Sequence, residues 1–347
     1  MDKPKLNIIP NSIISMKNTN DLTMSQLILV LTHEHDQATV NELIRKFCLQ
    51  STSSEIIKKG MEFLYINGYY NDLQILINKN SEINCPSHKS WATVYQMMLD
   101  RKKMQKTPQT ILQLLNNFQT DEPELKCLIE FLKIAAYYDL NQFDRVGNFL
   151  DQQQQLFVEV EDQYLLSNFN NRLYQHLFLY YWVRNELIMA RKYAFRVLNQ
   201  TSNPKTKANL HVNLGLTYTF DTYFQGMYHL SEALKITNKH NLKNIKNVIE
   251  QQNIPFLSAV FQKVEGISTD DKSEQAHIEI AKGNLLKSKE ILQDIPINSP
   301  FRVYYLGMAE QNKDILLQSY KSFVEERSDH FFSRLPLNAL RELGNCK

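Results

Sequence analysis

The fold class is most visible in residues 204–233, PKTKANLHVNLGLTYTFDTYFQGMYHLSEA, which carry the spacing of a paired-helix repeat. The first half of the pattern is Leu214-Gly215-x-x-Tyr218, and the second half is Gly226, Leu230 and Ala233. Small residues at these points let two helices approach closely. Because such a unit cannot bury its apolar face alone, it must stack on neighbouring units. The stretch therefore predicts a stack of tetratricopeptide-like helix pairs.

The same spacing recurs on both sides of this stretch. One repeat earlier the matching positions are Ala190, Ala194 and Val197, and later Leu306-Gly307 is followed by Ser319 and Phe323. From about residue 24 onward, apolar residues recur at spacings of three and four, and no convincing alternating strand is present. We therefore expect an all-α protein, a right-handed superhelix of tetratricopeptide-like helix pairs with a concave face suited to a peptide.

Local signals predict where several helices begin. Proline is tolerated in the first turn of a helix, and five prolines stand at such positions: Pro86, Pro108, Pro123, Pro204 and Pro300. Thr39-x-x-Glu42 and Thr52-x-x-Glu55 predict two capping boxes, in which a threonine and a glutamate satisfy each other's backbone donors. The segment Lys263–Lys272 is expected to be a loop.

Composition limits the protein class. The 347 residues include only 9 Gly and 10 Pro, which argues against a turn-rich β protein, and the net charge of +2 gives no general attraction to nucleic acid. Four cysteines lie far apart without a C-x-x-C spacing, so neither zinc nor a disulfide framework is indicated. No signal peptide and no long apolar run are present. We expect a cytoplasmic protein without a membrane segment.

No motif indicates catalysis. The chain lacks G-x-S-x-G, H-E-x-x-H, a Walker loop and a dinucleotide fingerprint, so an enzyme is the least favoured class and no cofactor is expected. His33-Glu34-His35-Asp36 could supply metal ligands, but alternate residues do not share one helix face, and a solvated turn is expected instead. Arg101-Lys102-Lys103 with Lys106 fits a helix end, where cations are favoured; nucleic-acid binding is the alternative.

A polar stripe is the strongest binding candidate along the repeat. Lys205, Asn209 and Asn213 follow one another at four-residue spacing and so share one helix face. Asparagine can bond a peptide amide through both its donor and its acceptor, and lysine can meet a terminal carboxylate. An ordinary solvent-exposed face is the alternative.

Two acids and one aromatic residue complete the candidate site. Glu274 and Asp329 lie at or near predicted helix N-termini, where a capping role is the default. If the two acids converge on the groove, they form a site for an arginine side chain, and each charge-assisted hydrogen bond contributes about 1.5–3 kcal/mol. Phe331, in the same segment as Asp329, is a further candidate contact.

Several local matches give the chain a family resemblance. They include Glu274-Gln275-Ala276-His277, Glu310-Gln311-Asn312-Lys313 and Arg334-Leu335-Pro336, and the similarity runs from about Asn41 to Leu343. On these residues the chain resembles the arbitrium peptide receptors (AimR) of SPbeta-type phages. These proteins sense a short secreted peptide and set the choice between lysis and lysogeny. A more distant relation to the helical-repeat quorum-sensing receptors of the Rap and PlcR type is also indicated.

The resemblance implies a peptide site. In the family, a helical-repeat domain binds a communication hexapeptide, and an N-terminal helix-turn-helix binds phage DNA when peptide is absent. Glu274 and Asp329 fall on the acids that hold the peptide's arginine. Lys205 stands where the family has an arginine, and Leu179 and Leu216 stand where it has polar contacts. We therefore expect a hexapeptide with an arginine but with a different sequence.

The resemblance also suggests shortened termini. Residues 1–50 are expected to be a short arm with helices, the remnant of a helix-turn-helix region, and residues 51–347 the peptide-sensing domain. The chain stops before the Leu-rich segment that helps relatives dimerise, which predicts a monomer or a weak homodimer. The expected output is a protein partner such as a phage repressor. Operator DNA released by peptide, and a host signalling enzyme modulated by peptide, are the alternatives.

Overall fold

The computed structural model describes residues 23–345, apart from the side chains of residues 148–151, 153, 154 and 345. This part of the chain contains helices and no strand, so the predicted all-α class is confirmed. Consecutive helices pack as neighbours along the chain, and the pair formed by α12 (Pro204–Leu216) and α13 (Tyr223–Lys239) has an extensive contact. None of the described helices is both long enough and apolar enough to cross a membrane.

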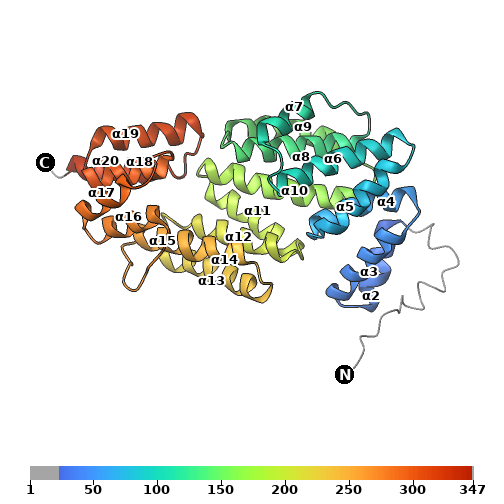
Figure 1. Ribbon diagram of the computed structural model, residues 1–347, viewed down its shortest axis with the longest axis horizontal. Coiled ribbons are helices and arrows are strands. Elements are labelled where there is room, and N and C mark those ends of the chain that lie inside the picture. The colour runs from blue at the N-terminus through green and yellow to red at the C-terminus, as the bar shows by residue number, and fades with distance from the viewer. Residues whose placement is uncertain (1–22, 346–347) are drawn as a thin grey trace, which may run out of the picture. The chain divides into compact units, whose positions relative to one another are not determined.

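Figure 1 shows the helices of the described chain, which divides into two compact units. Unit 1 comprises residues 23–136 and 152–170, and unit 2 comprises residues 137–151 and 171–345. Unit 1 contains α2 (Met24–Glu34), α3 (Gln37–Gln50), α4 (Ser54–Ile66), α5 (Tyr70–Glu82), α6 (Pro86–Lys102) and α7 (Pro108–Asn116). Three helices have residues in both units: α8 (Pro123–Asp139), α9 (Asp144–Val158) and α10 (Gln163–Val183).

Unit 2 continues with α11 (Leu187–Gln200), α12, α13, α14 (Lys243–Val248), the π-helix η2 (Ile249–Asn253) and α15 (Ile254–Val260). It ends with α16 (Lys272–Ala281), α17 (Leu285–Gln293), α18 (Pro300–Glu310), α19 (Lys313–Lys321), the π-helix η3 (Ser322–Glu326) and α20 (Arg334–Asn345).

The expected domain boundary at residue 50 separates a helix-turn-helix remnant from a peptide-sensing domain. The two units are defined by their internal packing, so they do not test this boundary. Residues 24–50 form α2 and α3, and residues 1–22 lie outside the described part of the chain. The remnant helix-turn-helix therefore stays a prediction.

The helix starts confirm some local signals and correct others. Helices α6, α7, α8, α12 and α18 begin at the five predicted prolines, and residues 263–271 connect α15 to α16 as a loop. Both predicted capping boxes are wrong. Asp36 caps α3 by accepting hydrogen bonds from the N–H groups of Ala38 and Thr39, and Ser53 precedes α4 without a side-chain cap. Asp36 therefore takes the capping role that was predicted for Thr39.

The predicted close approach of paired helices is confirmed at Gly215 and Gly226. A Cβ atom added to Gly215 would lie 2.9 Å from the carbonyl oxygen of Gly226, and one added to Gly226 would lie 2.6 Å from a methyl group of Leu257. Ala190 and Ala194, one repeat earlier, are fully buried. The small residues are therefore present because the backbones of the paired helices nearly touch.

Two charged segments serve local structure. At residues 33–36, where a solvated turn was expected, His33 and Glu34 end α2 and Asp36 is the cap of α3. In the basic run, Arg101 donates to the carbonyl oxygen of Ala135, and Lys106 pairs with Asp100. These contacts favour the helix-end interpretation over nucleic-acid binding.

Candidate functional site

The polar stripe lies on α12 as predicted. Lys205 and Asn209 are exposed and Asn213 is half-buried, while Ala208 and Leu214 on the other side of the helix are fully buried. The helix is capped by Asn203, whose side chain accepts hydrogen bonds from the N–H groups of Lys205 and Thr206. The stripe is thus a regular helix face, with its packing contacts made by other side chains.

Glu274 does not serve as the cap of α16. Asp271 caps this helix by accepting hydrogen bonds from the N–H groups of Ser273 and Glu274. The Glu274 side chain turns inward and is only 12% exposed. Its Oε1 accepts a hydrogen bond of 3.1 Å from the hydroxyl of Tyr305. The capping role expected by default for Glu274 is therefore filled by Asp271.

The other carboxylate oxygen of Glu274 is buried without a hydrogen-bond partner. It lies 3.5 Å from Nδ1 of His277, which is also buried and unpartnered. The imidazole of His277 stacks on Tyr305, with ring centroids 4.3 Å apart. Burial, followed by the charge of Glu274, raises the pKa of Tyr305 well above its usual value, so the phenol stays protonated as a donor.

Asp329 organises the turn before α20. It follows η3 and Ser328, whose φ is +55°. Its own N–H donates to the carbonyl oxygen of Phe323, and its Oδ1 accepts a 2.9 Å hydrogen bond from the N–H of Phe332. Burial raises the pKa of Asp329 to about 6, opposed by backbone N–H groups and by the charge of Arg327. The Asp329 carboxylate therefore helps to hold the turn that leads into α20.

Phe331 is fully buried in the core of unit 2. Its ring packs against Phe220 at 5.1 Å and Trp182 at 5.9 Å, and Phe332 lies 4.9 Å away. As found, the side chain has no accessible surface, so it positions the turn; a contact with a peptide would require it to become exposed.

Aromatic packing connects the three parts of the predicted site. Asp329 holds Phe332, whose ring lies 5.9 Å from Phe256, and Phe256 lies 5.6 Å from His277 beside Glu274. On the other side, Leu214 of α12 shares a core cluster with Phe331. The structure therefore connects Glu274, Asp329 and Phe331 through one aromatic core, and the buried side of α12 packs on that core while Lys205 and Asn209 are exposed.

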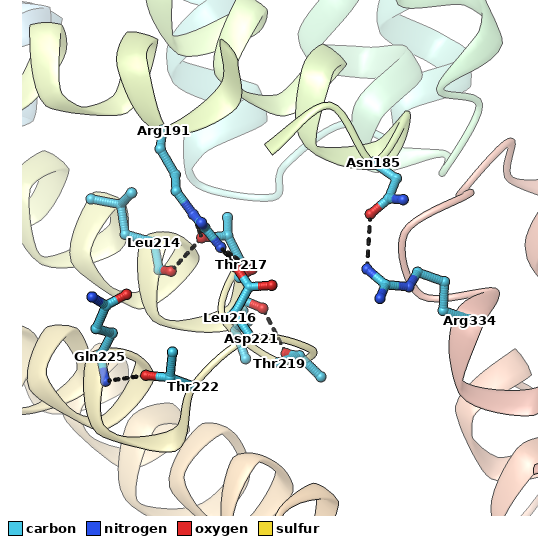
Figure 2. Close-up of polar contacts among 10 residues, drawn as sticks. All are labelled: Asn185, Arg191, Leu214, Leu216, Thr217, Thr219, Asp221, Thr222, Gln225 and Arg334. Atoms are coloured by element: carbon cyan, nitrogen blue, oxygen red, sulfur yellow. Dashed lines mark hydrogen bonds and ion pairs between the residues drawn. The ribbon is translucent and has the colours of Figure 1, made fainter. Parts of the chain in front are cut away.

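The sequence reasoning missed the contacts that dock the C-terminal turn. Figure 2 shows Arg334 donating to Oδ1 of Asn185 at 3.2 Å, and its guanidinium lies 4.2 Å above the ring of Phe220. The N–H groups of His330 and Phe331 both donate to the carbonyl oxygen of Val183. Arg334 belongs to the Arg334-Leu335-Pro336 match, but no sequence signal links it to Asn185.

A second missed group surrounds Arg191, also drawn in Figure 2. Its guanidinium donates to the side chain and carbonyl oxygen of Thr217 at 3.0 and 2.7 Å, and to Asp221 at 2.5 Å. It also lies 3.7 Å above the ring of Tyr218. These contacts tie α11 to the turn between α12 and α13, next to the polar stripe.

The surroundings of Glu274 suit a cationic polar group. Its largely buried carboxylate has one oxygen that makes no hydrogen bond, whereas the stripe on α12 carries one ammonium and two amides. A guanidinium donor matches such an oxygen in both charge and geometry.

Comparison with known proteins gives consistent results. A family model described as AimR transcriptional regulator-like matches residues 40–342. An uncharacterised Bacillus anthracis protein, pXO2-35, is 23% identical over 234 residues, which is 64% of this chain and 86% of that protein.

Two solved structures share the fold. A structure of phAimR with ligand has a TM-score of 0.75 and 16% identity, covering 93% of this chain and 98% of the other. A selenomethionine phAimR structure has a TM-score of 0.67 and 16% identity, covering 92% and 85%. At this identity the likeness establishes the fold alone.

Proposed function

The chain belongs to the AimR transcriptional regulator-like family, and we propose that it is a receptor for a short arbitrium-type communication peptide. In this proposal a phage uses it in the cytoplasm of the bacterial host cell to regulate the choice between lysis and lysogeny. The ligand is a hexapeptide that contains an arginine.

The observation that carries the proposal is the state of Glu274. Burying a carboxylate is costly unless its oxygens are hydrogen-bonded. Tyr305 satisfies one oxygen, and the other makes no hydrogen bond, with Nδ1 of His277 at 3.5 Å. The cap of this helix is supplied by Asp271, so Glu274 is not needed there. A peptide guanidinium would provide the missing donor and contribute about 1.5–3 kcal/mol.

The remaining predicted residues have supporting roles in this proposal. Asp329 would gain a nearby positive charge, which favours its ionised form. Lys205 would meet a peptide carboxylate, and Asn209 and Asn213 would bond peptide amides. Phe331 would act through the packing of the turn that carries Asp329.

Signalling requires that the peptide bind one conformation more tightly than another, because only differential affinity shifts a conformational equilibrium. We place the output in a protein partner such as a phage repressor, since a net charge of +2 gives no general attraction to DNA. Operator DNA is the alternative, and steeply salt-dependent binding would support it. A host signalling enzyme is the third candidate, and a stable complex with it would support that output. We propose a monomer or weak homodimer.

The test is thermal unfolding with and without synthetic arginine-containing hexapeptides, chosen from small open reading frames beside this gene. At a hundred times its dissociation constant the peptide should stabilise the protein by about 2.7 kcal/mol. Glu274→Gln keeps the shape of the side chain and should lose most of this gain. A peptide with citrulline in place of arginine should lose the same amount, with little further loss in the variant.

The matched control is Glu279→Gln on the same helix. Glu279 is also buried, but its oxygens already accept hydrogen bonds from Lys282 and Asn284. This variant should respond to the peptide like the parent protein. Equal responses of the Glu274 and Glu279 variants would refute the assignment of Glu274, and no response of the folded parent protein would refute the receptor itself.

A further inference from the structure

A serine, a histidine and an asparagine form a linear hydrogen-bonded array in unit 1. Ser54 is the first residue of α4, Asn80 lies in α5, and His88 lies in the first turn of α6. These three helices lie side by side (Figure 1). Nε2 of His88 is 2.7 Å from Oγ of Ser54, and Nδ1 of His88 is 2.7 Å from Oδ1 of Asn80.

The asparagine determines the tautomer of the histidine. Nδ2 of Asn80 donates to the carbonyl oxygens of Leu76 at 2.9 Å and Ile57 at 3.3 Å. Its Oδ1 therefore faces His88 and accepts the Nδ1–H. The lone pair of Nε2 then points at the Ser54 hydroxyl, as a general base must toward a serine nucleophile.

Burial holds this geometry. Asn80 is fully buried and His88 is 3% exposed, whereas Ser54 is exposed to solvent. Burial, and then the charge of Lys58, lower the pKa of His88, opposed by Glu122. The imidazole is therefore neutral at pH 7 and can accept a proton, while the hydroxyl remains accessible to a reagent.

The start of α4 supplies donors beside the hydroxyl. The first N–H groups of a helix have no intrahelical partner. Ser53, the residue before α4, makes no side-chain cap, so the first-turn N–H groups of Ser54, Glu55 and Ile56 are not covered by it. Such N–H groups, at the positive end of the helix dipole, stabilise a developing oxyanion.

We propose that Ser54 is an activated nucleophile that accepts an acyl group from small esters, with His88 as its base and Asn80 as the positioning residue. Oγ attacks the ester carbonyl while Nε2 takes the hydroxyl proton. The bond to the alcohol then breaks, and the alcohol leaves with that proton. Water repeats the same steps to release the acid and restore the serine. No linear motif reveals this site, because its members come from three helices.

The experiment uses p-nitrophenyl acetate, with intact-mass and peptide mass spectrometry as the readout. In samples quenched with acid before water releases the acyl group, we expect up to one acetyl group per chain, at Ser54, and Ser54→Ala should abolish it. Ser53→Ala is the matched control, because that serine is adjacent, lacks a histidine partner, and should be dispensable. His88→Gln should slow acylation about a hundredfold, the low end of a general-base contribution.

The pH profile separates catalysis from simple exposure. Acylation should be constant above pH 7 and fall in acid as His88 is protonated, with Lys58 and Glu122 as the charged groups that face it. Circular dichroism checks that each variant is folded. Acylation of Ser54 in the folded protein no faster than that of Ser53, or a rate unchanged in folded His88→Gln, would overturn the proposal. The array would then only satisfy a buried histidine.

Discussion

Two histidines, His88 in unit 1 and His277 in unit 2, are almost equally buried, at 3% and 4% exposure, but their hydrogen bonding differs. Both ring nitrogens of His88 make hydrogen bonds, whereas Nδ1 of His277 and the Glu274 oxygen 3.5 Å from it make none. When the polar atoms of a buried site are all hydrogen-bonded, as the ring nitrogens of His88 are, the chain itself supplies the partners that they need. An unsatisfied one needs a further explanation, such as an ordered water, local strain or a ligand.

The same contrast separates the two functional proposals. Around His88 the groups are preorganised for chemistry at an exposed hydroxyl. Around His277, in the proposed function, the arginine of the peptide supplies the missing donor. The surroundings of a buried polar residue are therefore more informative than its burial.

The largest expected effect comes from replacing each histidine by phenylalanine. His88→Phe leaves Oδ1 of the fully buried Asn80 without a donor and should lower the free energy of unfolding by about 3 kcal/mol. His277→Phe keeps an aromatic ring against Tyr305 and removes an unpartnered nitrogen, so its cost should stay below about 1.5 kcal/mol. Urea unfolding measures the free energy of unfolding of both variants. Equal losses would contradict the predicted difference between the two histidines.

The next effect concerns the second acid of unit 2. Asp329 has a pKa of about 6 in the folded protein, above the usual aspartate value of about 3.9, so the folded state binds the proton more tightly. The stability from this protonation is fully present below the usual value and is lost as the pH rises toward 6. Asp329→Asn imitates the protonated form and should stabilise the peptide-free protein at pH 7 by up to about 3 kcal/mol.

Unfolding measured at pH 4 to 8 tests this prediction. The difference between the variant and the parent protein should grow with pH and level off above pH 6. A difference independent of pH would mean that the capped turn, not protonation of Asp329, accounts for the change. The same variant should lose affinity for the peptide, because its neutral amide cannot pair with arginine.

The smallest effect sharpens the comparison at Glu274. Without peptide, Glu274→Gln replaces a buried, half-satisfied carboxylate by a neutral amide that can still accept from Tyr305. We expect the variant to be as stable as the parent protein or more stable by about 1 kcal/mol. Chemical denaturation without peptide measures the difference. A loss of several kcal/mol would show that Glu274 stabilises the fold and is not held for a ligand.

Local sequence signals predicted much of the scaffold. First-turn prolines marked five helix starts, and Gly215 and Gly226 marked a close approach of paired helices. These signals succeed because they depend on the backbone within one or two turns. The two capping boxes failed because several residues near a helix start compete for one role, and Asp36 won at α3.

The sequence by itself determined the helical class, the repeat of helix pairs and the one-sided stripe of Lys205, Asn209 and Asn213, since all of these follow from residue spacing along a helix. Only the tertiary structure decided that Glu274 bonds Tyr305 and that His88 links Ser54 to Asn80. Those contacts join residues on different helices. Their distances depend on how whole helices pack, which no local spacing encodes.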